Sequence, residues 1–367
     1  MSKIPSLLDF DRLFSHAERA TSLLDRCRPA NASAEMDRLA SRWEAGEPAL
    51  PDWRYAPKPD LAALLDVLEE AAKHPPIDGP IGELYARRAG ELFREAAIVD
   101  ALGTPEFRRR AAARFTIDAS EHGEQAARWA LEWSRLAPPA EPLRVRSDDE
   151  DDPRSLFSAL SALVGKLRLP VRITKTDAIS SSAAAGDGFV VIREGLWHSP
   201  HSAQRIAAHE IYGHVLPRHR ARDESLGLFA VGTCGASDDE EGRALLIEDR
   251  EGLFDDGRRR ELGVRHCMAA AVFGGADWVD AVRIGLEHGI AARHAVAMAT
   301  RVHRGGGLAR ELVYLPALSR VRAAFESDPS LEEWLSRGRI AVSAARVLAR
   351  FFAQSESVQA NVATTGV

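Results

Sequence analysis

The chain has 367 residues, 45% of them hydrophobic and 28% charged, which is the composition of a globular protein that can bury at least one substantial core. A formal net charge of −6, from 48 Lys and Arg against 54 Asp and Glu, argues against a nucleic-acid partner. Three cysteines without paired spacing, no signal peptide and no apolar stretch long enough to cross a bilayer indicate a soluble, cytoplasmic protein without a membrane partner.

The first part of the chain carries the pattern of helices throughout. Between residues 81 and 102, for example, apolar side chains recur at close to the helical period of about 3.6 residues. A proline-rich stretch at residues 137–142 (APPAEP) and a run of like charge at residues 148–152 (DDEDD) interrupt this pattern. We therefore expect an all-helical N-terminal region, residues 1–142, and a second domain, residues 143–367.

The second domain begins with signals for β-structure. Residues 171–176 (VRITKT) and 188–193 (GFVVIR) are β-branched runs, and Ser180–Asp187 between them reads as a Ser/Ala/Gly loop. The two runs predict a small sheet of two adjacent strands. Ser199, followed by a proline, then predicts the start of a helix that continues through His214.

The most specific motif of the sequence lies on that helix, at residues 209–214 (HEIYGH), an HExxxH pattern. Zinc prefers imidazole nitrogen and carboxylate oxygen, and catalytic zinc sites use three protein ligands and one water molecule. His209 and His214 could supply two of these ligands. Glu210, next to the first histidine, could then take a proton from the water that the metal activates.

The spacing of the two histidines predicts a distorted helix. In a regular α-helix, residues five positions apart are rotated by about 140° and lie on different faces. A π-bulge brings such residues together and is common at functional sites. We expect a wide turn of this kind near Tyr212 and Gly213, because glycine lowers the cost of an unusual backbone conformation.

A third ligand should come from a later helix. The acidic segment at residues 238–244 (DDEEGRA) offers Glu241 as the first choice and Glu240 as the second. Such an acidic segment is also a good helix N-terminus without any metal. The two motifs together favour a metal site over two unrelated structural features.

Four segments of this part of the chain form an ordered set, at residues 209–216 (HEIYGHVL), 240–244 (EEGRA), 300–305 (TRVHRG) and 311–315 (ELVYL). They resemble the HEIGTH-type helix and the QEGLA, TRVFRG and KDLVYL segments of a metallopeptidase family. Its eukaryotic members include the tubulin tyrosine carboxypeptidases, and its bacterial members are described by the QEGLA motif. The similarity extends over roughly residues 165–325.

This resemblance implies zinc coordination by His209, His214 and Glu241, catalysis by Glu210, and a C-terminal exopeptidase reaction. It also places the catalytic domain in residues 143–367. The predicted fold is therefore α+β and mostly helical: a zincin-like catalytic domain with a small β-sheet beside the HExxxH helix, preceded by the all-helical N-terminal region.

The chain departs from the family pattern at two places. Arg243 stands where leucine is usual, and residues 308–311 (LARE) stand where the family carries FTKD. Both departures fall in expected substrate-contact regions, so the resemblance does not extend to the tyrosine preference of the tubulin enzymes.

A carboxypeptidase needs a cation for the terminal carboxylate of its substrate. A guanidinium group binds a carboxylate through two parallel hydrogen bonds, so the candidates for substrate binding are Arg301, Arg304 and Arg310. Each of them also has a simpler interpretation as a member of a surface ion pair.

Peptide hydrolysis also needs a hydrogen-bond donor for the oxyanion that develops on the scissile carbonyl. The candidates are Tyr314, as a further catalytic residue, and His294 and His303. Glu248, two helical turns after Glu241, is expected to orient a ligand histidine rather than to bind metal.

Three functions remain open from the sequence. The first is a zinc carboxypeptidase acting on the C-terminus of a peptide or protein. The second is a zinc endopeptidase or processing protease, which would use the same metal site in an open cleft. The third is a non-catalytic metal-binding regulatory protein, against which the presence of Glu210 argues. The sequence predicts neither the oligomeric state nor the role of the N-terminal region.

Overall fold

The computed structural model describes residues 6–138, 143–177, 179 and 181–365. Its first helices are α1 (Leu7–Thr21), α2 (Leu23–Arg26), α3 (Ala32–Glu44), α4 (Ala62–Lys73), α5 (Pro80–Asp100), α6 (Phe107–Arg114) and α7 (Glu121–Trp133). Five strands and one helix follow, namely β1 (Val145–Arg146), α8 (Leu156–Leu167), β2 (Arg172–Thr176), β3 (Ala183–Gly186), β4 (Phe189–Arg193) and β5 (Trp197–His198).

The rest of the described chain is helical. Its elements are α9 (Pro200–Ala208), the π-helix η1 (His209–Val215), α10 (Leu216–Arg220), the 3-10 helix η2 (Ala221–Asp223), α11 (Leu228–Val231), α12 (Ala236–Arg250), α13 (Asp256–Phe273), α14 (Trp278–Glu287), α15 (Ala292–Val302), α16 (Arg304–Gly307), the 3-10 helix η3 (Arg310–Val313), α17 (Tyr314–Ser327), α18 (Ser330–Ser336) and α19 (Val342–Thr365). The predicted α+β, mostly helical fold is confirmed, while its zincin-like character stays a prediction.

The larger sheet has the strand order β2-β4-β3, with β2 parallel and β3 antiparallel to β4. The prediction of two adjacent strands is confirmed for β2 and β4. The prediction of a loop over Ser180–Asp187 is wrong for residues 183–186, which form β3; Ser180 lies outside the described residues. Gly188, at φ +78°, allows a two-residue hairpin turn that returns the chain onto β4. Alanines are uncommon in strands, so composition alone did not indicate this one.

An apolar layer joins the larger sheet to the motif helix. Val190 and Ile192 on β4 pack in one buried cluster with Leu160 of α8, Ile206 of α9 and Ile211 of η1. The HExxxH segment is thus held against the sheet by its own apolar residues, which leaves the two histidines free to face α12.

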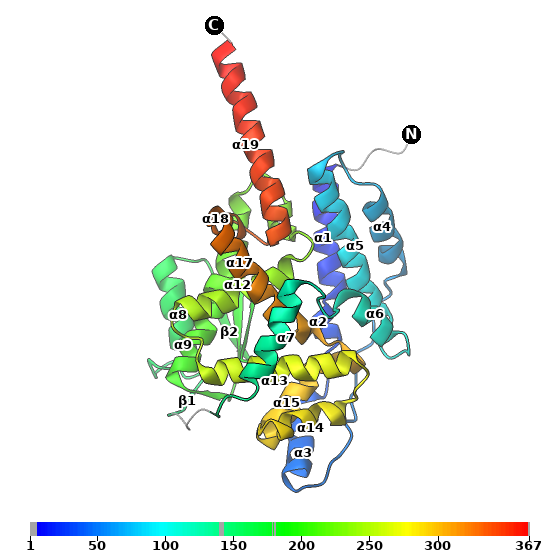
Figure 1. The fold of residues 1–367 in the computed structure, drawn as a ribbon, viewed down its shortest axis with the longest axis vertical. Helices are drawn as coiled ribbons and strands as arrows, with labels where there is room; N and C mark the ends of the chain where they lie inside the picture. Colours follow the sequence, from blue (N-terminus) through cyan, green and yellow to red (C-terminus); the bar gives the residue numbers. More distant parts are fainter. Residues whose placement is uncertain (1–5, 139–142, 178, 180, 366–367) are drawn as a thin grey trace.

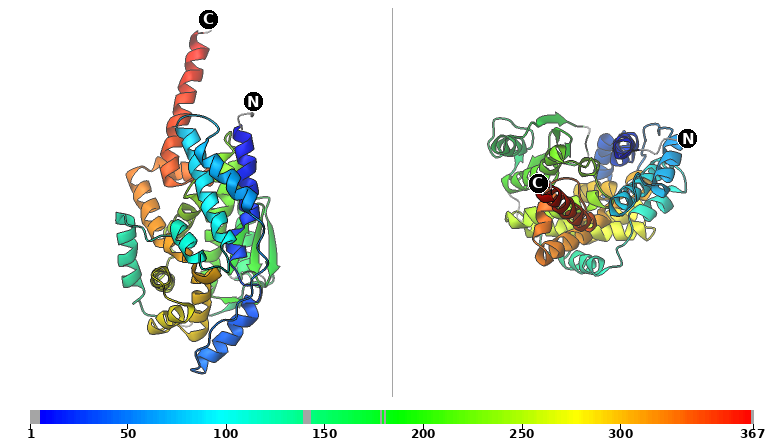
Figure 2. Two further views of the ribbon diagram at one scale, coloured as in Figure 1. Left: turned by 90° about the vertical axis from the view of Figure 1, so that its right-hand side faces the viewer. Right: turned by 90° about the horizontal axis from the view of Figure 1, so that it is seen from above.

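A second apolar cluster extends across the molecule. In Figures 1 and 2 the sheet with α8 and α9 lies on one side, α1, α4 and α5 lie on the other, and α12 and α17 lie between them. Phe14 and Tyr85 from the first helices share this cluster with Leu245 of α12 and Leu315 of α17. Residues 139–142 lie outside the described residues, and a domain boundary near residue 142 stays a prediction. Among the described helices, none is both long and apolar enough to span a bilayer.

Candidate metal centre

The helix that carries the motif starts as predicted and then changes its winding. The Ser199 hydroxyl accepts a hydrogen bond from the Ser202 amide at 3.0 Å, and a proline occupies the first turn of α9. From His209 to Val215 the backbone forms a π-helix, in which hydrogen bonds link residues five positions apart. The predicted wide turn is confirmed, and it extends over the whole motif.

Two residues adapt the neighbouring helix α12 to this π-helix. A Cβ atom on Gly213 would lie 2.6 Å from the Cβ atom of Ala244, so only glycine allows the two helices to approach this closely. The buried Arg243 side chain donates a hydrogen bond to the Gly213 carbonyl. Arg243 therefore points to η1 and does not line the cavity described below, contrary to the expected substrate contact.

The winding brings the three proposed metal ligands together. His209 Nε2 lies 3.4 Å from His214 Nε2 and 3.4 Å from Glu241 Oε2, and His214 Nε2 lies 3.9 Å from the same carboxylate oxygen. All three side chains are almost completely buried. Two ligand atoms on a tetrahedral zinc ion, each about 2.05 Å from it, lie about 3.3 Å apart. The spacing of these donor atoms, and their chemistry, therefore fit zinc.

The far side of the first imidazole is fixed by Glu248. Its Oε1 lies 2.7 Å from His209 Nδ1, which confirms the expected orienting contact, and its side chain is fully buried. Burial alone would lower the pKa of His209, but the hydrogen bonds to Glu241 and Glu248 raise it to about 9. Two carboxylates thus hold one imidazole by its two nitrogens.

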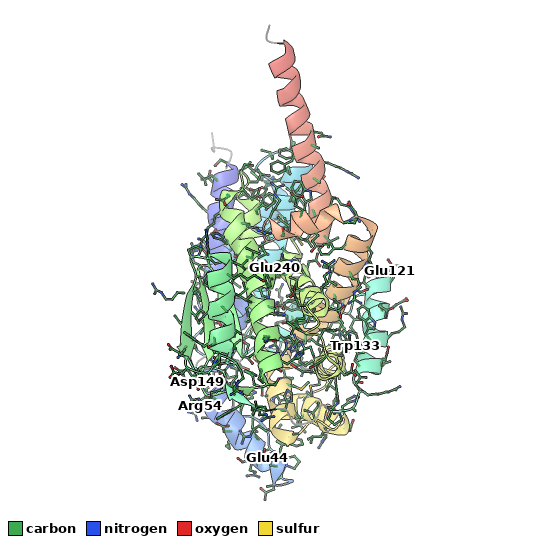
Figure 3. All side chains as sticks on the ribbon, turned by 90° about the vertical axis from the view of Figure 1, so that its left-hand side faces the viewer. Glu44, Arg54, Glu121, Trp133, Asp149 and Glu240 are labelled. Carbon is green, nitrogen blue, oxygen red and sulfur yellow. The ribbon has the colours of Figure 1, made fainter. Side chains whose placement is uncertain are left out.

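Glu240, the second choice from the sequence, lies behind His214. Its Oε2 is 3.8 Å from His214 Nδ1 and 3.4 Å from Arg218, so it faces the nitrogen turned away from the other two ligands. Burial raises the pKa of Glu240, but Arg218 and the His214 hydrogen bond outweigh it and hold the pKa below its usual range. Figure 3 shows Glu240 in the middle of the molecule, while Glu44 and Glu121 lie at its edges in that view.

The metal ligands open onto a cavity of about 1130 Å³. Glu210 lines this cavity, and its carboxylate makes no hydrogen bond or ion pair with any described residue. Consecutive residues of the β3 hairpin, 181–185, line another part of the wall. Eleven arginines and six carboxylates contribute to the lining, so the cavity favours anionic groups.

Two of the three predicted substrate arginines converge on one tyrosine. Arg301 Nη2 and Arg310 Nη1 donate to the Tyr314 hydroxyl oxygen at 2.9 and 3.0 Å, and Arg310 Nη2 donates to Glu241 Oε1 at 3.1 Å. Burial, together with Glu241, raises the pKa of Tyr314, so its hydroxyl stays protonated at neutral pH. Arg304 lines the same cavity; burial and the nearby Arg301 lower its pKa to about 10.

The two histidines that were candidates for binding the oxyanion, His294 and His303, lie in different places. His294 lines the cavity, whereas His303 is not among the lining residues. The Nε2 atom of His303 instead lies 3.1 Å from Arg108 Nη2 on α6. The structure therefore does not bring His303 to the metal ligands.

A ring of mostly buried ion pairs and hydrogen bonds links residues around the site, and no local pattern in the sequence indicated it. Arg258 pairs with Glu248 at 3.0 Å and with Glu261 at 3.6 Å. Arg265 then bridges Glu261 and Glu311, at 3.0 and 2.9 Å, and Glu311 binds Arg301 at 2.8 Å. Arg301 and Arg310 both donate to the Tyr314 hydroxyl, and Arg310 also binds Glu241. His209, which contacts both Glu241 and Glu248, completes the ring. Three members lie on one face of α13, at positions 258, 261 and 265, but periodicity cannot tell which partner that face meets.

Comparison with protein families gives one match. A family model described as microtubule-associated tyrosine carboxypeptidase matches residues 43–361. Comparisons with curated proteins and with solved structures give no match. The matched range includes all three candidate metal ligands, Glu210 and the three candidate arginines. Three lining residues of the cavity, Leu24, Asp25 and Arg28, precede it.

Proposed function

The chain belongs to the microtubule-associated tyrosine carboxypeptidase family, and on this premise we propose that it is a zinc-dependent carboxypeptidase that removes C-terminal residues from a protein or peptide. Carboxypeptidase-type chemistry follows from the family, while the metal and the roles of individual residues are our proposal. One observation carries it: His209, His214 and Glu241 converge beside Glu210 at the wall of one cavity.

His209, His214 and Glu241 would hold the zinc ion. When bound, zinc supplies the Lewis acidity that makes a water molecule nucleophilic and polarises the scissile carbonyl. Glu248 keeps the His209 ring in place by accepting a hydrogen bond from Nδ1, which leaves the Nε2 lone pair for the metal.

Glu210 acts as the general base. Its carboxylate takes the proton of the attacking water and passes it to the nitrogen of the leaving residue, so that an amine departs. A carboxylate already engaged in an ion pair would be a weaker base, and that of Glu210 makes no such pair with the described residues.

Tyr314 stabilises the oxyanion. Its oxygen already accepts hydrogen bonds from Arg301 and Arg310, so the hydroxyl proton is directed away from them and can be donated to the carbonyl oxygen of the substrate. The two guanidinium groups also make this proton a better donor.

The terminal carboxylate of the substrate binds at the arginine group, which consists of Arg301, Arg304 and Arg310. Arg304 is its main contact. Arg304 lines the cavity together with Arg301 and Arg310. Burial and the neighbouring Arg301 lower the pKa of Arg304, and an anionic ligand would stabilise its charged form.

The free edge of β3 binds the main chain of the substrate. Ser182 accepts a backbone hydrogen bond from Arg193 at 2.9 Å, so in this antiparallel register Ala184 also pairs with β4. The peptide groups of Ala183 and Ala185 then face the free edge, and both residues line the cavity. An extended peptide can add to such an edge as a further strand.

The proposal is tested with zinc-loaded protein and a mixture of peptides, each present with a free and with an amidated C-terminus. Mass spectrometry should show stepwise loss of C-terminal residues from the free peptides only, and no loss with the Glu210→Gln variant. Equal cleavage of free and amidated peptides at internal bonds would identify an endopeptidase. Zinc binding without any cleavage would leave a non-catalytic metal-binding protein.

A further inference from the structure

A short segment near the start of the chain forms part of the cavity wall. Leu24 and Asp25 on α2, and Arg28 just after it, line the same cavity as the candidate metal ligands. Arg28 precedes the range of the family match, so no role can be transferred to it from the family. Its half-buried guanidinium makes no hydrogen bond or ion pair with any residue in the described part of the chain.

The backbone holds Arg28 firmly next to the arginine group. Cys27 is completely buried and packs in one cluster with Phe107 and Leu308. Phe107 also adjoins the segment that carries Arg304, because a Cβ atom on the neighbouring Gly305 would overlap the Phe107 ring. On the other side, the Ala30 amide donates to the Arg54 carbonyl at 2.6 Å.

The charge of Arg28 is not neutralised by its nearest acidic neighbour in the sequence. Asp25 accepts a hydrogen bond from the Ser22 hydroxyl at 2.8 Å, and its side chain is exposed. This part of the cavity wall therefore carries a cation whose backbone is held in place and whose guanidinium makes no hydrogen bond or ion pair with the described residues. A guanidinium in such a place is suited to a carboxylate, which it can bind with two hydrogen bonds.

We propose that Arg28 binds the side chain of the C-terminal residue of the substrate, and that the enzyme preferentially removes glutamate or aspartate. This inference rests on the proposed function. With the terminal carboxylate held at Arg304, the side chain of the same residue extends to the adjoining wall, where Arg28 lies. The preference would distinguish this chain from a carboxypeptidase that selects tyrosine.

The first experiment compares peptides that are identical except for a final Glu, Gln, Tyr or Lys. For the wild type, kcat/KM should be at least about 10-fold higher for Glu than for Gln, the effect of one hydrogen-bonded charge pair. Arg28→Ala should abolish this preference, with the larger loss of kcat/KM on the Glu peptide. Arg26→Ala is the matched control, because Arg26 lies two residues before Arg28, at the end of α2, and does not line the cavity; it should preserve the ratio.

Charge reversal makes the test independent of a general loss of activity. Arg28→Glu should prefer the peptide that ends in Lys, with zinc content and circular dichroism equal to those of the wild type. Equal loss on all four peptides in Arg28→Ala, or a wild type that favours Tyr, would overturn the inference.

A binding measurement distinguishes failure of the proposed subsite from failure of the proposed peptidase activity. Fluorescence anisotropy of labelled Glu and Gln peptides on the zinc-loaded Glu210→Gln protein measures the preference without turnover. A Glu preference that depends on Arg28 supports the subsite even if the wild type releases no residue from any peptide, which would refute only the peptidase activity. Equal affinity for both peptides overturns the subsite.

Discussion

His209 Nδ1 lies 2.7 Å from Glu248 Oε1, while the other ring nitrogen of His209 lies 3.4 Å from Glu241 Oε2. The two glutamates are seven residues apart on α12, which is about two helical turns, so they project from the same face of the helix. One helix therefore supplies both a candidate metal ligand and the group that orients a second ligand. When a metal binds, this arrangement would keep a proton on Nδ1 and leave the Nε2 lone pair for the ion.

The first prediction concerns this orienting contact. Glu248→Gln should weaken zinc binding by about 10-fold to 100-fold, the usual range for the loss of an orienting partner of a metal-bound histidine. Competition with a chromogenic chelator measures the affinity. Glu251→Gln, at the exposed end of the same helix, is the control and should bind zinc like the wild type. Unchanged affinity in both variants would show that Glu248 only balances the charge of Arg258.

The second prediction separates the base from the ligands. Glu210→Gln should retain zinc and lose turnover, because the amide keeps the shape of the side chain but cannot accept a proton. His209→Ala should lose the metal itself. Emission spectroscopy of the purified proteins gives the zinc content. Zinc loss of equal size in the two variants would mean that Glu210 is a ligand or a structural residue.

The third prediction tests the close approach of η1 and α12. Gly213→Ala should destabilise the protein by about 1–3 kcal/mol, the typical cost of adding a methyl group where there is no space. Ala244→Gly removes the Cβ atom that the new Cβ would meet. The double variant should therefore be destabilised by less than the sum of the two single variants. Urea unfolding gives the three free energies of unfolding. Strict additivity of the two substitutions would show that the contact does not determine the packing.

The sequence could predict this part of the site because the motif conflicts with a regular helix. His209 and His214 can meet only on a π-helix, so the spacing itself required the distortion that the structure contains. The choice of Glu241 rested on a segment with few alternatives. Glu248 followed from the helical period alone, counted from Glu241.

Other parts depended on contacts between distant segments, which local patterns do not encode. Ala183–Gly186 became a strand only because a hairpin turn returns it to β4, although alanine is a poor strand former. Glu311 lies in a segment recognised by resemblance, yet its ion pairs with Arg265 and Arg301 come from the packing of α13 against η3. Arg28 is likewise brought to the cavity from the opposite end of the chain.

The fourth prediction uses the pKa of Glu311. Burial would raise this pKa, but Arg301 and Arg265 outweigh it and lower it from 4.5 to about 2. A group with a lowered pKa in the folded state stabilises the protein above its unfolded pKa, and this stabilisation is lost as the pH falls through the folded value. The difference in unfolding free energy between the wild type and Glu311→Gln should therefore shrink as the pH falls from 4.5 towards about 2. Urea unfolding of both proteins at several pH values checks this, and a constant difference would contradict it.

The last prediction assigns different roles to two neighbouring arginines. Arg310 donates to Glu241 Oε1 at 3.1 Å, which leaves Oε2 facing the histidines, so Arg310 positions a metal ligand. Arg310→Gln should therefore lower zinc affinity in the chelator competition as well as kcat. Arg304 lines the same cavity, and we assign it to the substrate.

Arg304→Gln should accordingly keep the zinc affinity of the wild type and raise KM for peptides with a free C-terminus. Loss of one hydrogen bond to a charged group amounts to about 1.5–3 kcal/mol, which corresponds to roughly a 10-fold to 150-fold change in kcat/KM. Amidated peptides, which lack the terminal carboxylate, should be equally poor substrates for the wild type and for this variant. If Arg304→Gln reduced zinc affinity as much as Arg310→Gln, both arginines would belong to the support of the metal site. The terminal carboxylate would then have to bind elsewhere in the cavity.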